Sequence, residues 1–287
     1  MFLTDFILET RGSARVWLSN SYADPAFVSL LADADRLFDD SKCHVIKDQR
    51  KIKVGRLTVN IAGTRRSIYV KRYNVSSLRY RLGSLFFQSG ALRSLQGADV
   101  LAVAGIPTAT PVASVEDRNY GMLRKSFFVS EEIAGAKTSD RYWIEKLQDR
   151  EDREAFQLRR AYLARLAGLF EALHARRIYH DDLKDANIMV VAGGNGGSVD
   201  FFLLDLEGVR RCSRLSRRRR VKNLVQLYRT LGKHLTRSQK LSFLKNYLRA
   251  SYANRALKRN LIVRVLRRAR RVDRRKTPGF WGGRTVI

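Results

Sequence analysis

The chain has 287 residues, of which 45% are hydrophobic, so it is long enough to bury an ordinary hydrophobic core. Its 56 lysines and arginines outnumber its 27 aspartates and glutamates, and the formal net charge of +29 favours an anionic partner. The two cysteines, Cys43 and Cys212, form no C-x-x-C pair, which excludes a disulfide framework and a cysteine zinc site and favours a reducing cytoplasm.

The N-terminus carries no obvious targeting segment. Residues 1–10 contain two acids and no basic run, so we expect no secretory signal. No apolar stretch approaches the ~18–20 residues that a membrane-spanning helix requires. We therefore expect a cytoplasmic protein that is soluble or peripheral to a membrane.

The N-terminal part of the chain predicts a short helix followed by strands. Asp24 before Pro25 is typical of a helix start, and apolar residues recur up to residue 38 as on one helix face. Residues 43–46 and 51–61 predict a hairpin. The hairpin contains no G-x-G-x-x-G motif, so its loop is basic rather than glycine-rich.

The middle of the chain predicts helices around one more pair of strands. Residues 78–104 have a helical pattern, which Gly105 and the nearby proline end. Residues 110–115 and 126–133 predict two antiparallel strands. Residues 154–176 carry apolar side chains at three-, four- and seven-residue spacing, which predicts a core helix.

The most informative segment is YHDDLKDAN at residues 179–187. Asn187 follows Asp182 by five positions, and Asp205 ends an apolar strand 18 residues beyond Asn187. This order and spacing are typical of protein-kinase-like phosphotransferases. Transfer from ATP needs a carboxylate to deprotonate the acceptor hydroxyl, for which Asp182 is the candidate. It also needs an amide and a carboxylate to hold Mg²⁺, for which Asn187 and Asp205 are the candidates. The alternative is a capped surface turn. We interpret His180 as a residue that braces the loop.

Two upstream segments are candidates for nucleotide binding, and we expect the hairpin of residues 43–46 and 51–61 to cover the nucleotide. Lys71 ends a strand with alternating Ile68 and Val70, as does the lysine that pairs the α- and β-phosphates in V-A-I-K strands. Its alternative is a solvated strand end. Glu131 and Ile133 lie at the end of the predicted strand pair, where a hinge backbone would meet adenine. For them too the alternative is an exposed strand end.

Several pieces of the chain resemble the lipopolysaccharide kinase family, whose members phosphorylate 3-deoxy-manno-octulosonic acid (Kdo) or heptose in the lipopolysaccharide inner core. The resembling pieces are YVKRYN, GIPTATPVA, FFVSEEIAG, YHDDLKDANIMV and LLDLEGVR, with RVKNLVQLYRTL as a weaker sixth, and they span roughly residues 45–232. The resemblance implies a sugar hydroxyl as acceptor, ATP and Mg²⁺ as cofactors, and a lipopolysaccharide partner.

One feature of the kinase-like pattern is missing. In protein kinases a helix glutamate pairs with the strand lysine, but this chain has no glutamate between Lys71 and Glu116. Gln96 or Asp99 could substitute, or the nucleotide alone could position Lys71. The absence also keeps a pseudokinase among the alternatives. Glu207 is a candidate for a further metal contact or for an ordinary solvated side chain.

Basic residues concentrate in two segments. Residues 210–222 contain eight basic residues and no acid, and residues 255–276 contain eleven and one acid. In the second segment Leu257, Leu261 and Val265 recur every four residues, which predicts a basic amphipathic helix. It could pack on the protein, dock on an anionic membrane, or bind nucleic acid. Because it contains no aromatic residue for base stacking, we favour a membrane or lipopolysaccharide over nucleic acid.

The sequence therefore predicts a bilobal, kinase-like α+β fold. We expect an antiparallel-sheet N-lobe over residues 1–133 and a mainly helical C-lobe over residues 134–287. Asp182 would act as the base, and Lys184 would stabilise the migrating phosphoryl group. The expected enzyme is a lipopolysaccharide sugar kinase at the inner face of the cytoplasmic membrane. Its alternatives are a small protein Ser/Thr kinase and a nucleotide- or RNA-binding pseudokinase. The oligomeric state does not follow from the sequence.

Overall fold

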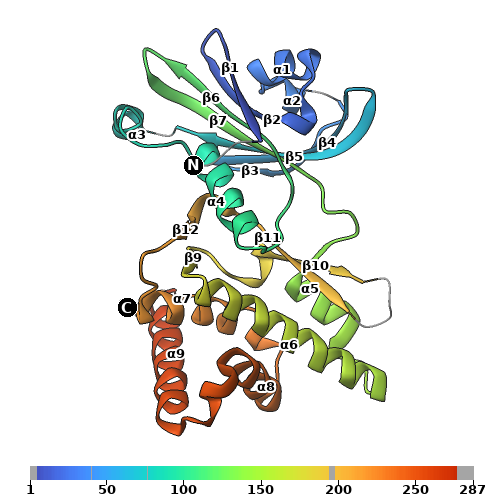
Figure 1. Cartoon of the computed structure of the whole chain (residues 1–287), viewed down its shortest axis with the longest axis vertical. Helices are drawn as coiled ribbons and strands as arrows, with labels where there is room; N and C mark the ends of the chain where they lie inside the picture. The colour runs from blue at the N-terminus through green and yellow to red at the C-terminus, as the bar shows by residue number, and fades with distance from the viewer. Residues whose placement is uncertain (1–4, 40, 76, 194–197, 277–287) are drawn as a thin grey trace, which may run out of the picture.

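The computed structural model describes residues 5–39, 41–75, 77–193 and 198–276. An antiparallel sheet with four helices forms the N-terminal part, and five helices with two small sheets form the described C-terminal part (Figure 1). This is the α+β, two-lobed architecture that the sequence predicts.

A seven-stranded antiparallel sheet dominates the N-terminal part, in the order β1-β2-β6-β7-β5-β4-β3. The interior strand β5 pairs with β4 on one side and β7 on the other, so that Lys71 lies between Val54 and Phe128. The strands are β1 (Phe6–Arg11), β2 (Ala14–Ser19), β3 (His44–Asp48), β4 (Ile52–Ile61), β5 (Thr64–Asn74), β6 (Pro111–Asn119) and β7 (Met122–Glu131). The predicted hairpin is thus confirmed as β3–β4, whereas β1 and β2 are additions that the sequence did not predict.

Two short helices, α1 (Pro25–Ala32) and α2 (Arg36–Asp39), pack their apolar side chains against this sheet. The predicted helix start is confirmed, because the Asp24 carboxylate accepts hydrogen bonds from the backbone N–H groups of Ala26 and Phe27. Phe27 and Leu31 lie in the same buried cluster as Ile68 of β5.

The prediction of one continuous helix over residues 78–104 is wrong. The structure has α3 (Leu78–Gly83) and α4 (Gly90–Val103), separated by six residues in other conformations. The second helix starts anew because the Ser89 hydroxyl accepts from the Leu92 N–H, as an N-cap does. Gly90 follows at once, and a Cβ there would lie 2.7 Å from the Tyr73 ring, so only glycine fits.

The C-terminal part is built around the long helix α6 (Arg153–Ala175), which confirms the predicted core helix. Its buried face carries Leu166 and Phe170. The other helices are α5 (Ser139–Trp143), α7 (Arg217–Arg229), α8 (Arg237–Leu248) and α9 (Arg255–Lys276). Two small sheets complete the part, β8 (Lys137–Thr138) with β10 (Ile188–Ala192) and β11 (Val199–Leu203), and β9 (Ile178–His180) with β12 (Val209–Arg211).

Helix α4 connects the two parts. Ala98 and Leu101 on this helix belong to the hydrophobic core of the C-terminal part. Gly97 lies so close to the segment after Asp205 that a Cβ would be 2.2 Å from the Leu206 carbonyl oxygen. The position of α4 therefore fixes where the chain turns after β11, at the predicted metal-binding aspartate.

The apolar stripe of α9 packs on α7. Ala269 is 1% exposed and contacts Val221 and Val225 of α7, and Leu261 and Val265 pack against the same cluster. Of the three interpretations of the basic helix, packing on the protein is the one that the structure shows for the stripe. Leu261 and Val265 are therefore not free to enter a membrane, whereas Leu257 and most arginines of α9 remain exposed.

Candidate active site

The predicted catalytic loop lies between β9 and β10, and a buried histidine holds its shape. The Nε2–H of His180 donates to the Leu204 carbonyl oxygen at 2.9 Å, and its Nδ1 accepts from the Asp182 backbone N–H at 3.2 Å. Burial lowers the pKa of His180, so the ring is neutral near pH 7 and suited to one donor and one acceptor role. These contacts agree with a bracing role for this residue.

The Asp182 side chain is the centre of the loop's polar contacts. Its carboxylate accepts from the Lys184 ammonium group at 2.6 Å, from the Asn187 amide at 3.1 Å and from the Gln226 amide at 3.3 Å. Asn187 also donates to the Asp182 carbonyl oxygen at 2.7 Å. The structure thus places Asp182, Lys184 and Asn187 together, and the half-exposed carboxylate remains accessible to an acceptor.

Lys71 and Asp205 form the second half of the site. The Lys71 ammonium lies 2.5 Å from an Asp205 carboxylate oxygen, although 134 positions separate the two residues. Burial opposes the charge of Lys71, but Tyr73, Asp205 and Glu207 raise its pKa above the ordinary value. Burial also opposes the charge of Asp205, yet Lys71 holds the pKa of this carboxyl below its usual range. Both groups are therefore charged at neutral pH.

The carboxylates near Lys71 come from the segment after β11, and not from helix α4. Neither Gln96 nor Asp99 forms a described hydrogen bond or ion pair with Lys71. The pKa of Asp99 is raised by burial and also by nearby Asp5, which places that side chain toward the N-terminus. Glu207 is half-buried, and burial raises its pKa although Lys71 acts in the opposite direction. The expectation that Gln96 or Asp99 substitutes for the helix glutamate is not supported.

Tyr73 completes the surroundings of Lys71. The ammonium lies 4.8 Å from the centre of the Tyr73 ring, and the Tyr73 hydroxyl is 2.8 Å from the Ser94 hydroxyl on α4. Helix α4 thus supports the lysine indirectly, through a tyrosine and a serine. The sequence pattern KRY included Tyr73, but only the fold shows its contact with Lys71.

We expect Glu207→Gln to weaken the electrostatic interaction that positions Lys71, without unfolding the protein. Removing one of the two carboxylates leaves the ammonium less fixed, so KM for ATP should rise about tenfold while kcat changes less. Steady-state kinetics with varied ATP measure this change. The matched control is Glu154→Gln, an exposed carboxylate on α6. A Glu207→Gln enzyme with the kinetics of the wild type would contradict a positioning role.

The residues present fit a magnesium ion of the kinase type. Within the described residues the Asn187 amide oxygen and the second Asp205 oxygen accept no hydrogen bond, since Asn187 donates through its nitrogen and Lys71 contacts the first oxygen. The described residues contain no cluster of three or more His, Cys, Asp or Glu ligands. Mg²⁺ commonly takes one or two protein oxygens and completes its shell with phosphates and water.

Asp205 adopts an unusual backbone conformation at this position. Its φ of 59° and ψ of 55° lie in the left-handed region. Aspartate is one of the few non-glycine residues that enter this region at modest cost. The turn separates β11 from the short helix η4 (Leu206–Gly208) and is held by the contact of Leu206 with Gly97.

The predicted hinge lies where β7 ends. The Glu131 carboxylate pairs with Arg66 at 2.9 Å, so its side chain is engaged within the sheet. The backbone N–H of Glu132 donates to Ser67, whereas the N–H of Ile133 donates to no group among the described residues. The backbone at Ile133 is therefore open to an outside acceptor. The N–H of Glu131 donates to the Thr110 carbonyl oxygen at 2.9 Å, so neither the side chain nor the N–H of Glu131 is open to a ligand.

Comparisons with known proteins decide the family. The model of the lipopolysaccharide kinase (Kdo/WaaP) family matches residues 41–247, which is more than half of the chain. The chain belongs to the lipopolysaccharide kinase (Kdo/WaaP) family. The resemblance identified from the sequence is thereby confirmed, and the protein is a kinase whose family acts on lipopolysaccharide. No curated protein sequence matches the chain.

A solved structure supports the fold of this lipopolysaccharide kinase. The structure titled "WaaP in complex with acyl carrier protein" matches with a TM-score of 0.66 and 22% sequence identity. The match covers 90% of this chain and 98% of that one. This agreement confirms the predicted kinase-like α+β fold. No helix in the described part of the kinase is long and apolar enough to cross a membrane.

Two residues of α7 that support the catalytic loop were not predicted. The Gln226 amide donates to the Asp181 carbonyl oxygen at 2.8 Å and contacts Asp182. Asn223 donates to the His180 carbonyl oxygen at 2.6 Å and contacts the buried His174. Both lie in the resembling piece RVKNLVQLYRTL. That piece was the only sequence signal for them.

Proposed function

We propose that this lipopolysaccharide kinase transfers the γ-phosphate of ATP to a hydroxyl group of Kdo or heptose in the inner core. The observation that carries the proposal is the presence of two sets of contacting residues in the site. In the first set Asp182 contacts Lys184 and Asn187. In the second set Lys71 contacts Asp205. The family supports a lipopolysaccharide acceptor.

Each side chain has a role that follows from its contacts. Asp182 accepts the proton of the acceptor hydroxyl and orients its oxygen toward the phosphate. Lys184 lies beside Asp182 and stabilises the charge of the migrating phosphoryl group. Lys71 holds the α- and β-phosphates. The backbone at Ile133 receives the adenine. Asn187 and Asp205 would hold Mg²⁺, which neutralises phosphate charge when it is bound.

The complete set of site residues favours an active kinase over a pseudokinase. Asp182, Asn187 and Asp205 are all present, and Lys71 has a carboxylate partner despite the missing helix glutamate. A small protein kinase is less favoured, because no A-P-E motif follows Asp205 and the basic residues 214–220 lie where an activation loop would be. We place the lobe boundary between residues 133 and 134, in the segment that follows β7.

A comparison of acceptors tests the proposed function. The purified kinase would be incubated with ATP, Mg²⁺ and, in separate reactions, a Kdo-bearing lipid A, a heptose-bearing core and a generic protein substrate. We expect acceptor-dependent ATP turnover with one of the two glycolipids and background turnover with the protein. Turnover that responds only to the protein would favour the protein kinase, and no turnover with any acceptor would favour the pseudokinase.

We also propose that the enzyme works at the cytoplasmic face of an anionic membrane. The net charge of +29 would draw it to acidic lipids through long-range attraction, which salt weakens over the ~8 Å Debye length at physiological ionic strength. Nucleic acid remains the less favoured partner.

A further inference from the structure

A ten-residue segment of the N-terminal part exposes an unusual number of large apolar side chains. We call residues 78–87 the apolar segment; it comprises α3 and the turn that follows. Phe86 is 85% exposed, Phe87 72% and Leu78 71%. Tyr80, Leu82 and Leu85 are also exposed, so this segment holds six of the sixteen exposed large apolar side chains of the described chain. Soluble monomers rarely expose so concentrated an apolar patch, and such patches mark interaction sites.

The charged residues within the apolar segment and next to it in the sequence have a single sign. Arg79 and Arg81 lie within it, and no acidic residue occurs between residues 72 and 98. Apolar side chains interleaved with arginines are the composition of segments that lie in the interface of an anionic bilayer. The arginines attract lipid phosphates while the aromatic rings enter the region below the headgroups.

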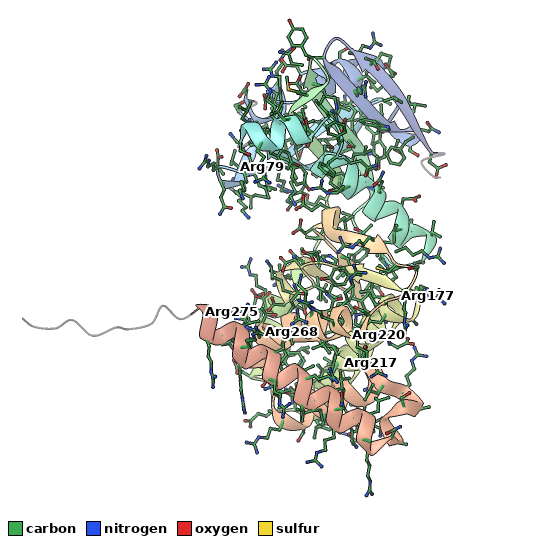
Figure 2. The ribbon with its side chains drawn as sticks, turned by 90° about the vertical axis from the view of Figure 1, so that its left-hand side faces the viewer. Arg79, Arg177, Arg217, Arg220, Arg268 and Arg275 are labelled. Carbon is green, nitrogen blue, oxygen red and sulfur yellow. The ribbon has the colours of Figure 1, made fainter. Side chains whose placement is uncertain are left out.

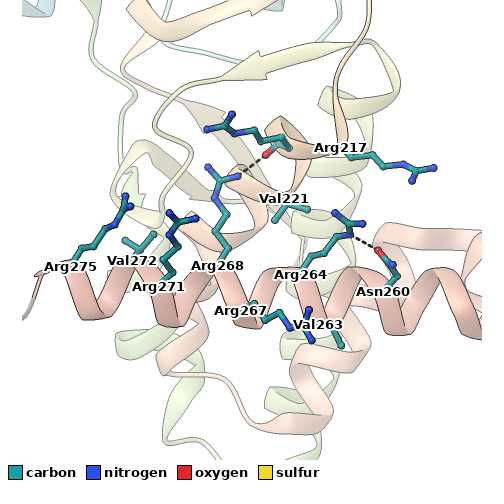
Figure 3. A pocket seen from close by; sticks show the side chains of 11 residues that line it. Arg217, Val221, Asn260, Val263, Arg264, Arg267, Arg268, Arg271, Val272 and Arg275 are labelled. Atoms are coloured by element: carbon teal, nitrogen blue, oxygen red, sulfur yellow. Dashed lines mark hydrogen bonds between the residues drawn. The ribbon is translucent and has the colours of Figure 1, made fainter.

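A second basic feature lies on the C-terminal part, between α7 and α9. Figure 3 shows this hollow, of about 1000 Å³, which we call the arginine groove. Its eleven lining residues include no acid and seven arginines, namely Arg217, Arg218, Arg264, Arg267, Arg268, Arg271 and Arg275. Among the residues that the structure describes, none of these seven takes part in an ion pair. Arg268 donates to the Arg218 carbonyl oxygen at 2.9 Å, which ties the two helices together.

Both features lie on one side of the molecule. Figure 1 places α3 and the C-terminal end of α9 at the left, one on each part of the fold. Figure 2 shows that side facing the viewer, with Arg79 above and Arg268 and Arg275 below, all toward the left of the picture. A flat anionic surface that approaches from this side would meet the apolar segment and the arginine groove together.

The arginine groove is also linked to the catalytic loop through α7. Lys222 of this helix pairs with Asp181 at 2.8 Å, and Gln226 contacts Asp182. With a rise of about 1.5 Å per residue, Arg218 lies roughly 12 Å along the helix from Gln226. A lipid phosphate held in the groove would therefore lie within the length of a few sugar units of the proposed base.

We propose that the apolar segment and the arginine groove form one membrane-docking face of this kinase. The arginines bind the phosphates of anionic lipids, for which their forked guanidinium groups are suited. Phe86 and Phe87 insert among the acyl chains. This deepens the proposed function, because an enzyme that phosphorylates a lipid-linked sugar must hold its catalytic loop at a fixed height above the bilayer. It also assigns insertion to the N-terminal part, since Leu261, Val265 and Ala269 of α9 are engaged with α7.

Sedimentation with lipid vesicles, without ATP or acceptor, tests the docking face. The wild type should bind vesicles of phosphatidylglycerol and phosphatidylethanolamine and retain a bound fraction at high salt, but should not bind phosphatidylcholine vesicles. Phe86→Ser with Phe87→Ser should lower the high-salt binding by at least about tenfold, because two aromatic side chains no longer insert. Arg264→Gln, Arg267→Gln and Arg271→Gln together should lower the low-salt binding by at least about tenfold.

A control and a second measurement separate docking from loss of folding. Phe156→Ser removes a 55% exposed phenylalanine from α6 and should bind vesicles like the wild type. In a Phe86→Trp variant, lipids with brominated acyl chains should quench the added tryptophan. Unchanged high-salt binding by the serine variant, or no quenching at position 86, would overturn the proposal. So would binding of the wild type that salt abolishes completely.

Activity measurements distinguish a failure of the docking face from a failure of the proposed reaction. The Phe86→Ser, Phe87→Ser variant should phosphorylate a detergent-dispersed acceptor at the wild-type rate and lose activity only toward the same acceptor in vesicles. If the wild type binds vesicles as expected but phosphorylates no lipid-linked sugar, the docking face stands and the proposed function fails. An equal loss with both forms of the acceptor would place the two phenylalanines in the site and contradict docking.

Discussion

Asp182→Asn should abolish phosphotransfer and leave ATP binding within a few-fold of the wild type. A general base contributes about 10²–10⁴-fold to the rate, and an amide cannot accept the proton of the acceptor hydroxyl. The affinity for ATP should change little, because the Asp182 side chain contacts Lys184, Asn187 and Gln226 within the loop. Turnover with a glycolipid acceptor and a separate titration with ATP measure the two effects.

The neighbouring carboxylate provides a matched control. Asp181 pairs with Lys222 at 2.8 Å and accepts from the Tyr179 hydroxyl at 2.9 Å. Asp181→Asn changes the same chemical group one position away, and we expect it to retain most of the activity. If Asp182→Asn keeps substantial turnover, or if both variants lose activity equally, Asp182 is not the base.

Asp205→Ala should have the second-largest effect, on the affinity for ATP. The direction of this effect should depend on whether Mg²⁺ is present. The carboxylate holds the nucleotide through Mg²⁺, so the affinity for Mg²⁺-ATP should fall about tenfold to a hundredfold, or about 1.4–2.8 kcal/mol. Without metal the same change removes an acid close to the phosphates and releases Lys71 from its partner at 2.5 Å. Metal-free ATP should therefore bind the variant as well as the wild type or better.

Two titrations with ATP, one with Mg²⁺ and one with a chelator, measure the affinity with and without metal. The variant must first be shown to be folded, because Asp205 occupies a left-handed turn that alanine adopts less readily. Asp205→Asn keeps the turn and removes the charge, and it should show the same dependence on metal. Equal loss of affinity in both titrations would indicate that Asp205 only supports the structure.

Much of the fold and the site could be predicted because the signals are local. The helix start at Asp24 is a cap followed by proline, the hairpin β3–β4 consists of two strand-like runs that are close in sequence, and the core helix α6 repeats its apolar residues. The catalytic loop could be predicted for a related reason. Asp182 and Asn187 are five positions apart, so the contact between them depends on one short turn.

The remaining features depend on contacts between distant parts of the chain. The partner of Lys71 comes from 134 positions away. Nothing in the helical pattern of α4 shows that Tyr73 lies between Ser94 of this helix and Lys71. The stripe of α9 has the same spacing whether it faces a membrane or α7. Only the packing of Ala269 on Val221 distinguishes these cases.

The break between α3 and α4 also depends on a contact between residues that are distant in sequence. Ser89 is a good cap, but a serine inside a helical pattern carries little information alone. Gly90 is required because the Tyr73 ring lies against it, and this contact joins residues that the sequence places 17 positions apart. The exposed apolar segment was missed for the same reason, since its side chains fit the pattern of a continuous helix.

The mass of the product tests the central claim most directly. A Kdo- or heptose-bearing lipid A would be incubated with ATP, Mg²⁺ and either the wild type or Asp182→Asn, and the glycolipid would then be analysed by fragmentation mass spectrometry. We predict one added phosphate on an inner-core sugar with the wild type and none with the variant. An unmodified glycolipid in the wild-type reaction, or equal phosphorylation by the variant, would contradict a lipopolysaccharide sugar kinase that uses Asp182 as its base.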